Sequence, residues 1–429
     1  MFEGAAQTLE DAQDLFDWRN WERMEPEQLG PYYEKRTNHE HLRTLLQALR
    51  GAVRSQKKGK WLHALYMGPP GCGKSTDLTW WAEQVSSDPT LEEPLLIRHF
   101  QIGEAVGTHD VGFAEVALAM VLEIYERFDA PNMPSLSEEH LQTIQAWLYA
   151  EKSTTTRSTT SGQAGMELPL LRFLKLGLSA RRVRENEVRV QLRQLLPELR
   201  QLLDTLLEEV ESRTGKHVLF VVDDLEKITP VDAALGLFLN HGGFFADLAC
   251  HIVFTAPSSL RLDPRYTPEV LKHFNESLAT LARPERDGKE TEEFDALRRV
   301  VYRRMDERLI ERAAVDRVVS CTGGLVAHVI DTIERAILLA MTRGEPRVTV
   351  PHVEEALKEI SSRYLAALRE GDYVELDRLE RLGPTAHVEK SELLHSLTVL
   401  EYPDSPTEFA VHPLVVPLLE RWRRGQLLR

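Results

Sequence analysis

Cysteine is scarce in this chain. Its 429 residues include three cysteines, Cys72, Cys250 and Cys321, an odd number whose spacing fits no zinc site. Neither a disulfide framework nor a metal-binding cysteine cluster is therefore expected. We predict a cytoplasmic protein whose thiols are reduced.

Long apolar runs are absent as well. No run approaches the ~18 residues that a membrane-spanning helix requires. The first residues, MFEGAAQTLEDAQD, also lack the basic and then apolar order of a signal peptide. We therefore expect no contact with a membrane.

The chain also lacks an excess of positive charge. Lys and Arg number 52 against 67 Asp and Glu, which gives a formal net charge of −15. This excludes a binding mode in which the whole surface attracts nucleic acid or an anionic membrane. A local basic face remains open, and its candidates are residues 180–184 with Arg189 and Arg193, and the segment from Arg421 to Arg424. The alternative for the second segment is a solvated helix end.

A glycine-rich loop is the most specific feature that is present. The segment GPPGCGKS, from Gly68 to Ser75, has every fixed residue of the phosphate-binding motif GxxxxGK[ST]. An apolar run precedes it and a helical pattern follows it, as this motif requires. Glycines let the backbone N–H groups turn toward phosphates, and the next helix adds the positive end of its dipole. The predicted ATP-binding residues are Gly68, Pro69, Pro70, Gly71, Cys72, Gly73, Lys74, Ser75 and Thr76.

Acidic residues follow a second apolar run, 218–222. We expect Lys74 to bridge the β and γ phosphates, and Ser75 and Asp223 to hold Mg²⁺. Asp224 occupies the position at which P-loop ATPases of the additional-strand type carry the carboxylate that orients the attacking water. Most such enzymes have Glu there, so the shorter Asp224 predicts slow hydrolysis. Glu226 is the rival base, and the alternative for both is a helix cap and a solvated turn.

Two further sets of side chains are weaker candidates. The apolar run 250–255 ends in Thr255, whose hydroxyl we expect beside the phosphates as a sensor, with Ser258 as the alternative; Thr is also common in strands without such a role. Three arginines lie where one of them would reach a phosphate, and the sequence does not choose among them. Each alone is more typical of a solvated or ion-paired surface arginine. They are Arg261, Arg265 and Arg283.

Changes in composition divide the chain into four regions. Residues 1–40 form an acidic, aromatic-rich arm that we expect to pack on the core. Residues 41–285 form the P-loop core, with strands at 61–67, 95–100, 218–222 and 250–255 and a polar insertion near 151–165. Residues 286–384 form a helical lid, and the order helix, strand, turn, strand predicts a winged-helix-like domain over 385–429. The predicted fold class is α/β: a P-loop NTPase parallel sheet with a helical lid and a C-terminal winged-helix domain.

These features together resemble the AAA+ and STAND group of P-loop ATPases, and most closely the origin-recognition-like bacterial ATPases. The resemblance extends over about residues 30–420 and rests on the two phosphate motifs, on Thr255, on Gly323 and Gly324 before a helix, and on the terminal pattern. It implies a lid that closes over the nucleotide. Many members carry a lid arginine shortly after a Gly-Gly pair, and here Ala327 stands at that place with His328 next to it. We therefore expect the lid arginine to be absent unless His328 replaces it.

Three functions are compatible with these patterns. The first is a switch that binds Mg-ATP, hydrolyses it slowly and controls a protein partner or its own assembly; the resemblance implies a bacterial defence or mobile-element system. The second is a DNA-binding ATPase of the initiator or transposition-regulator type, which uses the segment from Arg421 to Arg424. The third is a scaffold that holds ATP without hydrolysing it.

Overall fold

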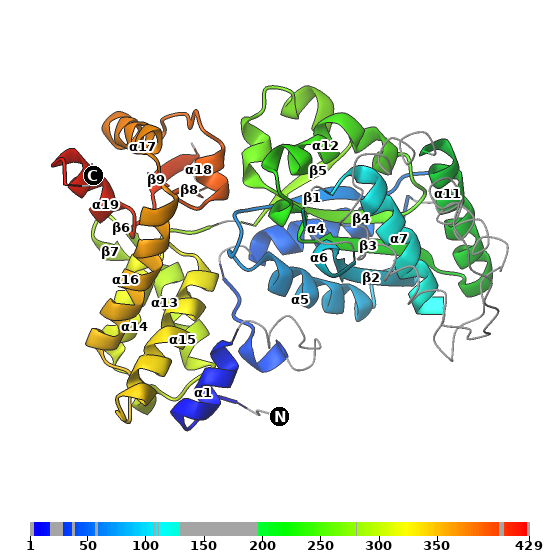
Figure 1. Cartoon of the computed structure of the whole chain (residues 1–429). Helices are drawn as coiled ribbons and strands as arrows, with labels where there is room; N and C mark the ends of the chain where they lie inside the picture. Colours follow the sequence, from blue (N-terminus) through cyan, green and yellow to red (C-terminus); the bar gives the residue numbers. More distant parts are fainter. Residues whose placement is uncertain are drawn as a thin grey trace, which may run out of the picture.

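The computed structural model describes residues 4–17, 29–36, 39–55, 59–105, 108–109, 111–128, 196–279, 281–402 and 407–426. The polar insertion near 151–165 and the basic residues 180–193 lie outside this set. Figure 1 shows two bodies: an α/β body formed by the middle of the chain, and a helical body formed by its last third together with α1 (Leu9–Phe16).

Five parallel strands form the sheet of the α/β body. Their spatial order is β2 (Leu95–Gln101), β3 (His217–Asp223), β4 (His251–Ala256), β1 (His63–Met67) and β5 (Asn275–Leu278). Every residue of β1 and β4 is buried, as expected for continuous apolar strands covered on both faces. Because β4 lies between the P-loop strand β1 and the acidic strand β3, the sheet has the additional-strand arrangement. The predicted α/β P-loop NTPase fold is confirmed.

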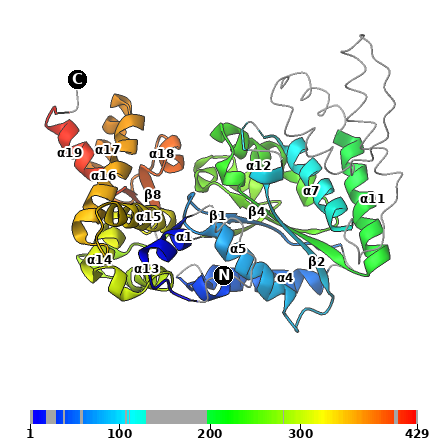
Figure 2. The same cartoon turned by 60° about the horizontal axis from the view of Figure 1, so that its bottom comes forward.

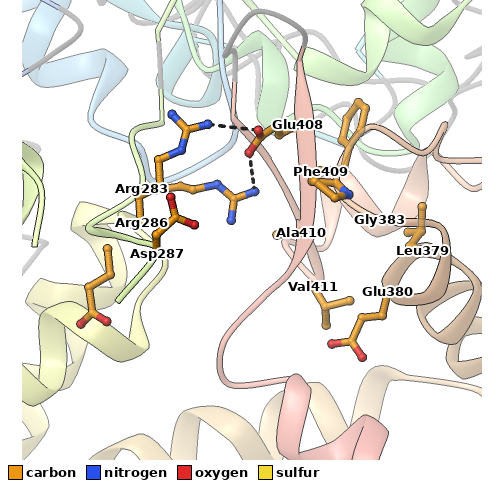
Figure 3. A pocket seen from close by; sticks show the side chains of 12 residues that line it. Arg283, Arg286, Asp287, Leu379, Glu380, Gly383, Glu408, Phe409, Ala410 and Val411 are labelled. Carbon is orange, nitrogen blue, oxygen red and sulfur yellow. Dashed lines mark hydrogen bonds and ion pairs between the residues drawn. The ribbon is translucent and has the colours of Figure 1, made fainter. Parts of the chain in front are cut away.

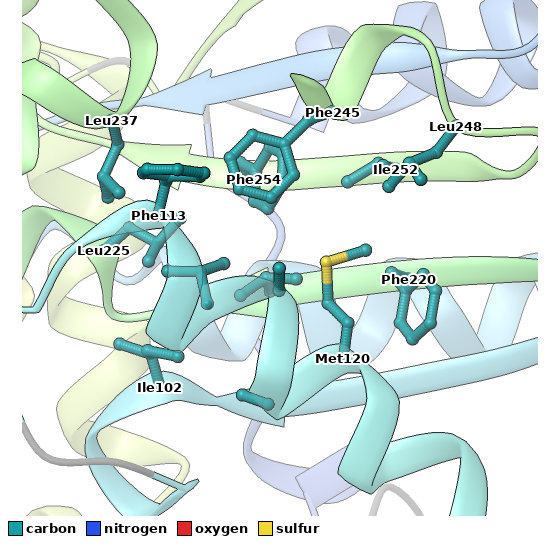
Figure 4. Packing of buried hydrophobic residues seen from close by; sticks show 14 of the residues in the cluster. Ile102, Phe113, Met120, Phe220, Leu225, Leu237, Phe245, Leu248, Ile252 and Phe254 are labelled. Carbon is teal, nitrogen blue, oxygen red and sulfur yellow. The ribbon is translucent and has the colours of Figure 1, made fainter. Parts of the chain in front are cut away.

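Helices cover both faces of the sheet (Figure 2). On one face lie α4 and α5, and on the other lie α7, α11 and α12. In the second layer, Met120 and Phe245 pack against Phe220 and Phe254 of the sheet (Figure 4). The helices of this body are α4 (His39–Val53), α5 (Lys74–Ser86), α6 (Ile102–Ala105), α7 (Phe113–Phe128), α11 (Leu196–Thr214) and α12 (Val231–Ala246). Short helical turns span Gly30–Tyr32, Leu225–Lys227, Ser258–Leu262, Tyr266–Val270 and Glu307–Leu309.

The helical body follows a short strand pair, β6 (Glu285–Arg286) and β7 (Lys289–Glu290). Its helices are α13 (Glu292–Tyr302), α14 (Arg312–Cys321), α15 (Val326–Thr342), α16 (Val350–Ala367) and α17 (Glu370–Leu382). The N-terminal helix α1 packs on α15 and shares its apolar cluster. Within the arm, α1 therefore covers the helical body, whereas Tyr33 and Arg36 contact α5 and the P-loop of the α/β core. The predicted packing of residues 1–40 on the core holds for this second part of the arm and not for α1.

The C-terminal unit contains α18 (Glu392–His395), β8 (Val399–Tyr402), β9 (Glu408–Val411) and α19 (Val416–Arg423). Strands β8 and β9 pair antiparallel, and its assignment as a winged helix stays a prediction. Leu400 and Tyr402 enter the apolar cluster around β1 and α5, whereas Val399 and Val411 enter the cluster of the helical body. The hairpin thus lies between the two bodies. None of the helices in the described part of the chain is both long and apolar enough to cross a membrane.

Candidate functional site

The P-loop connects β1 to α5, which begins at Lys74. Gly71 (φ 77°) and Gly73 (φ 103°) have left-handed backbone, which side chains with a Cβ rarely adopt. A Cβ at Gly68 would lie 2.7 Å from the carbonyl oxygen of Ala279, so this glycine is required by close packing. The first N–H groups of α5 face the loop, where they favour an anion. The predicted nucleotide-binding residues therefore lie together at the carboxyl end of β1.

Lys74 is buried, with 3% of its surface exposed. Its ammonium group donates to the carbonyl oxygens of Gly68 (3.0 Å) and Pro69 (2.9 Å) and pairs with Glu226 Oε1 at 2.8 Å. These three contacts match the three protons of the group. Burial acts to lower the pKa of Lys74, but Glu226 together with the other acidic groups around it raises that pKa. The lysine is thus a buried cation whose partner is a carboxylate of the site itself.

Three carboxylates gather at the end of β3. Asp223, Asp224 and Glu226 are all buried, and each has a carboxylate oxygen within 4.8 Å of those of the other two. The Ser75 hydroxyl interacts with Asp223, which brings the two predicted Mg²⁺ ligands together. Asp223 Oδ2 and Glu226 Oε2 are buried without a hydrogen-bond partner among the described residues. Such a cluster of hard oxygen atoms suits a divalent cation.

The pKa values of the three carboxyls differ in direction. Burial and the neighbouring Glu226 raise the pKa of Asp223. Burial and the neighbouring Asp223 raise the pKa of Asp224 to about 6. Burial acts to raise the pKa of Glu226 too, but Lys74 outweighs it and holds that pKa below its usual value. Glu226 is therefore the most persistent anion of the cluster, and Asp224 titrates near neutral pH.

The two candidates for the base face different neighbours. Asp224 has left-handed backbone (φ 70°), its Oδ1 pairs with Lys227 at 2.7 Å, and its Oδ2 lies toward Gly103. Glu226 lies against Lys74 instead. The geometry therefore brings Glu226, and not Asp224, beside Lys74, the predicted phosphate-binding lysine.

Thr255 holds the acidic turn in place. Its Oγ1 accepts a hydrogen bond from the Leu225 backbone at 3.1 Å, and its hydroxyl interacts with Glu226. The alternative candidate Ser258 is buried and interacts with Glu401 of the C-terminal hairpin. The sequence thus located Thr255 at the site, where it contacts the acidic residues directly.

The lid helix α15 meets the P-loop through its backbone. The Ala327 N–H donates to the carbonyl oxygen of Gly71 at 3.0 Å, and a Cβ at Gly71 would lie 2.8 Å from that of Ala327. The neighbouring His328 is turned away: its Nδ1 lies 3.1 Å from Nε2 of the buried His412. Burial lowers the pKa of His328 to about 4, so it is neutral. His328 therefore does not take the place of a lid arginine.

The three candidate arginines are all ion-paired. Arg261 pairs with Glu401 at 2.8 Å and Arg283 pairs with Glu408 at 3.1 Å, so both are held by the C-terminal hairpin. Arg265 is more than half exposed and pairs with Asp263, two residues away in the sequence. Gly68, Pro69, Arg261 and Glu401 line a space of about 10 Å³, which holds about one water molecule. The hairpin thus reaches the P-loop.

A larger cavity of about 430 Å³ lies between the β6–β7 pair and the C-terminal unit (Figure 3). Arg283 and Arg286 both extend to Glu408, as the dashed lines show. No P-loop residue lines this cavity, so it is not the nucleotide site. Carboxylates from the β6–β7 side and from the C-terminal unit line it together with the two arginines, so its lining carries charges of both signs.

The C-terminal basic segment is partly neutralised. Arg423 pairs with Asp377 (2.7 Å) and Glu380 (2.9 Å) of α17. Arg421 and Arg424 are exposed at the end of α19, and Arg424 lies 3.6 Å from Glu420. A continuous basic face is therefore not formed by the described residues of this segment.

Two groups of contacts at the site were missed by the sequence analysis. Arg36 of the N-terminal arm reaches the P-loop carbonyl of Cys72, and Glu401 of the hairpin reaches Arg261. Both contacts join residues far apart in the chain, and neither residue belongs to a local motif. The burial of charge is the only sign of them, and it appears only in the folded structure.

No protein-family model matches the chain, and no curated protein matches it. Among solved structures it is similar to the ORC1 protein of Aeropyrum pernix in complex with DNA, with 13% identity, a TM-score of 0.43 and coverage of 95% of this chain and 96% of that chain. It is similar to the ORC2 protein of Aeropyrum pernix (ADPNP-ADP complexes), with 12% identity, a TM-score of 0.43 and coverage of 97% and 98%. It is also similar to the Walker-type ATPase of Pyrococcus abyssi, with 15% identity, a TM-score of 0.41 and coverage of 95% and 99%. These likenesses concern arrangement, and function is inferred from the chain's own residues.

Proposed function

We propose that the chain is an ATP-dependent switch. It binds Mg-ATP at the P-loop, hydrolyses it slowly, and thereby controls a protein partner or its own assembly. The buried pair of Lys74 and Glu226 carries this proposal, because a phosphate group that binds Lys74 competes with Glu226, the one charged partner among its three contacts. A bacterial defence or mobile-element system, which the family resemblance implies, is the setting that we propose for it.

The residues fit a magnesium ion at the acidic cluster. Ser75 and Asp223 lie in contact, and Asp223 Oδ2 is buried without a partner among the described residues. Mg²⁺ prefers oxygen ligands and keeps several waters, so two protein ligands suffice. When bound, the ion supplies positive charge for the phosphate oxygens. Ser75 and Asp223 would hold it.

Displacement of Glu226 would change the electrostatic surroundings of the C-terminal unit. Glu226 interacts with Thr255 of β4, and its charge acts on His395 of α18. The hairpin residue Glu401 pairs with Arg261, which follows β4 in the sequence. A change at Lys74 therefore has a short path to the elements that lie between the two bodies.

Slow hydrolysis follows from the occupation of both base candidates. Asp224 is bound to Lys227, and Glu226 is bound to Lys74. A general base must come within hydrogen-bond reach of the attacking water. Each carboxylate is held through one oxygen by its lysine, which restricts its movement toward an attacking water and supports slow hydrolysis.

Substitution of Lys74 tests the proposal. Lys74→Ala should abolish binding of a fluorescent ATP analogue in the presence of Mg²⁺. The matched control is Lys227→Ala, which removes a lysine paired with Asp224 but away from the P-loop backbone, and which should retain binding. Light scattering with a slowly hydrolysed analogue then measures assembly. Unchanged binding in Lys74→Ala would refute the site.

DNA binding is the second candidate, favoured by the exposure of Arg421 and Arg424 at the end of α19. It predicts affinity for duplex DNA that falls steeply with salt and falls further when both arginines are changed to Gln. The ion pairs of Arg423 with α17 count against it. A single-turnover assay without phosphate release would instead favour the scaffold that holds ATP.

A further inference from the structure

One side chain joins three separate parts of the molecule. Arg36 comes from the N-terminal arm and is 8% exposed. Its guanidinium donates to the P-loop carbonyl oxygen of Cys72 and to Glu293 Oε1, the latter at 3.0 Å. Glu293 lies in α13 of the helical body and is 2% exposed. Both ends of this ion pair are therefore buried beside the P-loop.

The P-loop needs such a donor for a physical reason. A loop that turns its N–H groups toward phosphates must turn carbonyl oxygens outward, and a buried carbonyl requires a hydrogen bond. Lys74 provides it for Gly68 and Pro69, and Arg36 provides it for Cys72. A Cβ at Gly73 would lie 2.9 Å from Arg36 Nη2. The guanidinium thus packs directly on the backbone of the loop.

The surroundings of Arg36 hold it charged and in place. Burial acts to lower the pKa of Arg36, but Glu293, Asp77 and Cys72 together raise it. Asp77, on the first turn of α5, accepts hydrogen bonds from the hydroxyls of Tyr33 (3.1 Å) and Tyr66 (3.2 Å). The network therefore extends from the arm to both elements that flank the P-loop.

We propose that Arg36 is a positioning residue of the nucleotide site. Through Cys72 it holds the P-loop in the shape that receives phosphates, and through Glu293 it couples that shape to the helical body. The inference rests on the proposed function, since it concerns the same nucleotide. It adds that the arm and α13, which contain no motif, set the affinity for ATP.

Four variants and a control test the inference in the full chain. Arg36→Gln should weaken binding of a fluorescent ATP analogue with Mg²⁺ by about tenfold or more, since hydrogen bonds to charged groups are among the stronger ones. Glu293→Gln should weaken it in the same direction. The double variant should be no weaker than Arg36→Gln, because Glu293 acts through Arg36. Arg36→Lys retains the charge and should recover part of the affinity.

Arg298 provides the matched control. It lies in α13 like Glu293, its side chain is 9% exposed, and it pairs with Asp316 at 2.6 Å. Arg298→Gln should lower the melting temperature and leave the dissociation constant for the analogue unchanged. A merely structural Arg36 would behave in the same way.

The outcomes separate the two proposals. If the wild type binds the analogue and Arg36→Gln binds it equally well, or Arg298→Gln weakens it as much, the inference about Arg36 is wrong and the proposed function stands. If the wild type does not bind, both are wrong. If Arg36→Gln does not fold, Arg36→Lys and Glu293→Gln decide: wild-type affinity in both would refute the coupling.

Discussion

Replacement of Glu226 by Gln removes the carboxylate that pairs with Lys74 and leaves the shape of the side chain nearly unchanged. The pair is 2.8 Å long and both side chains are 2% exposed. Removal of one partner from a buried ion pair typically costs about 3–5 kcal/mol, because the other charge stays buried without compensation. The amide of Gln retains an oxygen that accepts from Lys74, so we expect a loss near about 3 kcal/mol in the absence of nucleotide.

The same substitution should tighten ATP binding. In the wild type a phosphate competes with the Glu226 carboxylate for Lys74, whereas in Glu226→Gln the phosphate relieves an uncompensated cation. If the whole penalty is recovered on binding, about 3 kcal/mol corresponds to roughly a 100-fold gain in affinity. We expect a gain between roughly tenfold and 100-fold, since the amide keeps part of the interaction.

Two measurements check this prediction. Chemical denaturation without nucleotide gives the lost stability, and titration of a fluorescent ATP analogue with Mg²⁺ gives the affinity. Glu375→Gln is the control: Glu375 is 5% exposed and pairs with Arg378 at 2.7 Å in α17, away from the P-loop. It should lose stability with no change in affinity. A Glu226→Gln protein that is destabilised and binds the analogue no better than the wild type would refute the displacement mechanism.

Three further substitutions have defined outcomes. If Asp224 is the base, kcat/KM should fall as the pH falls through about 6, because the carboxylate with its raised pKa becomes protonated there. Asp224→Asn should then remove this pH dependence together with most of the turnover. A pH dependence that persists in the variant would exclude Asp224 as the base. Glu401→Gln breaks the ion pair with the partly exposed Arg261 and should destabilise the protein by about 1 kcal/mol. Proteolysis within the hairpin should then be faster than in the wild type. Equal digestion of the variant and the wild type would contradict a stabilising role for this pair. Gly71→Ala places a Cβ on left-handed backbone and 2.8 Å from the Ala327 Cβ, so ATP binding should weaken by at least about tenfold. Wild-type affinity in this variant would show that the lid does not pack on the loop as observed.

The sequence predicted those parts of the fold that local patterns determine. The apolar runs at 61–67, 95–100, 218–222 and 250–255 coincide with β1, β2, β3 and β4. For β1, β3 and β4 the reason is burial on both faces, which favours continuous apolar residues, whereas the edge strand β2 is only partly buried. Strand β5 was missed since its four residues, NESL, form the edge of the sheet and lack an apolar run. The packing of the arm was predicted only in part: Tyr33 and Arg36 contact the α/β core, whereas α1 packs on the helical body. Amphipathic spacing in α1 shows that one face of the helix is covered, but it does not show which body covers it.

The candidate site divides in the same way. The P-loop and Asp223 were located from motifs, since adjacent residues determine the backbone conformation and the charge that phosphates require. The partner of Lys74 was not predicted, because Glu226 was considered as a base and its distance to Lys74 depends on the neighbouring strands. Arg36 and Glu293 are 257 residues apart, so no local pattern relates them.

The contacts of the lid and the arm with the P-loop have one property in common. Ala327 donates its backbone N–H to the carbonyl of Gly71, and Arg36 donates to the carbonyl of Cys72. Both hydrogen bonds are made to the outward side of the loop, whereas a lid arginine would bind the phosphate itself. Under the proposed function, the helical body would respond to the shape of the loop backbone, which a nucleotide would set when its phosphates take up the inward N–H groups. Such a proposed switch would need no arginine at position 327, because the loop itself would transmit the presence of ATP to the lid and to the arm.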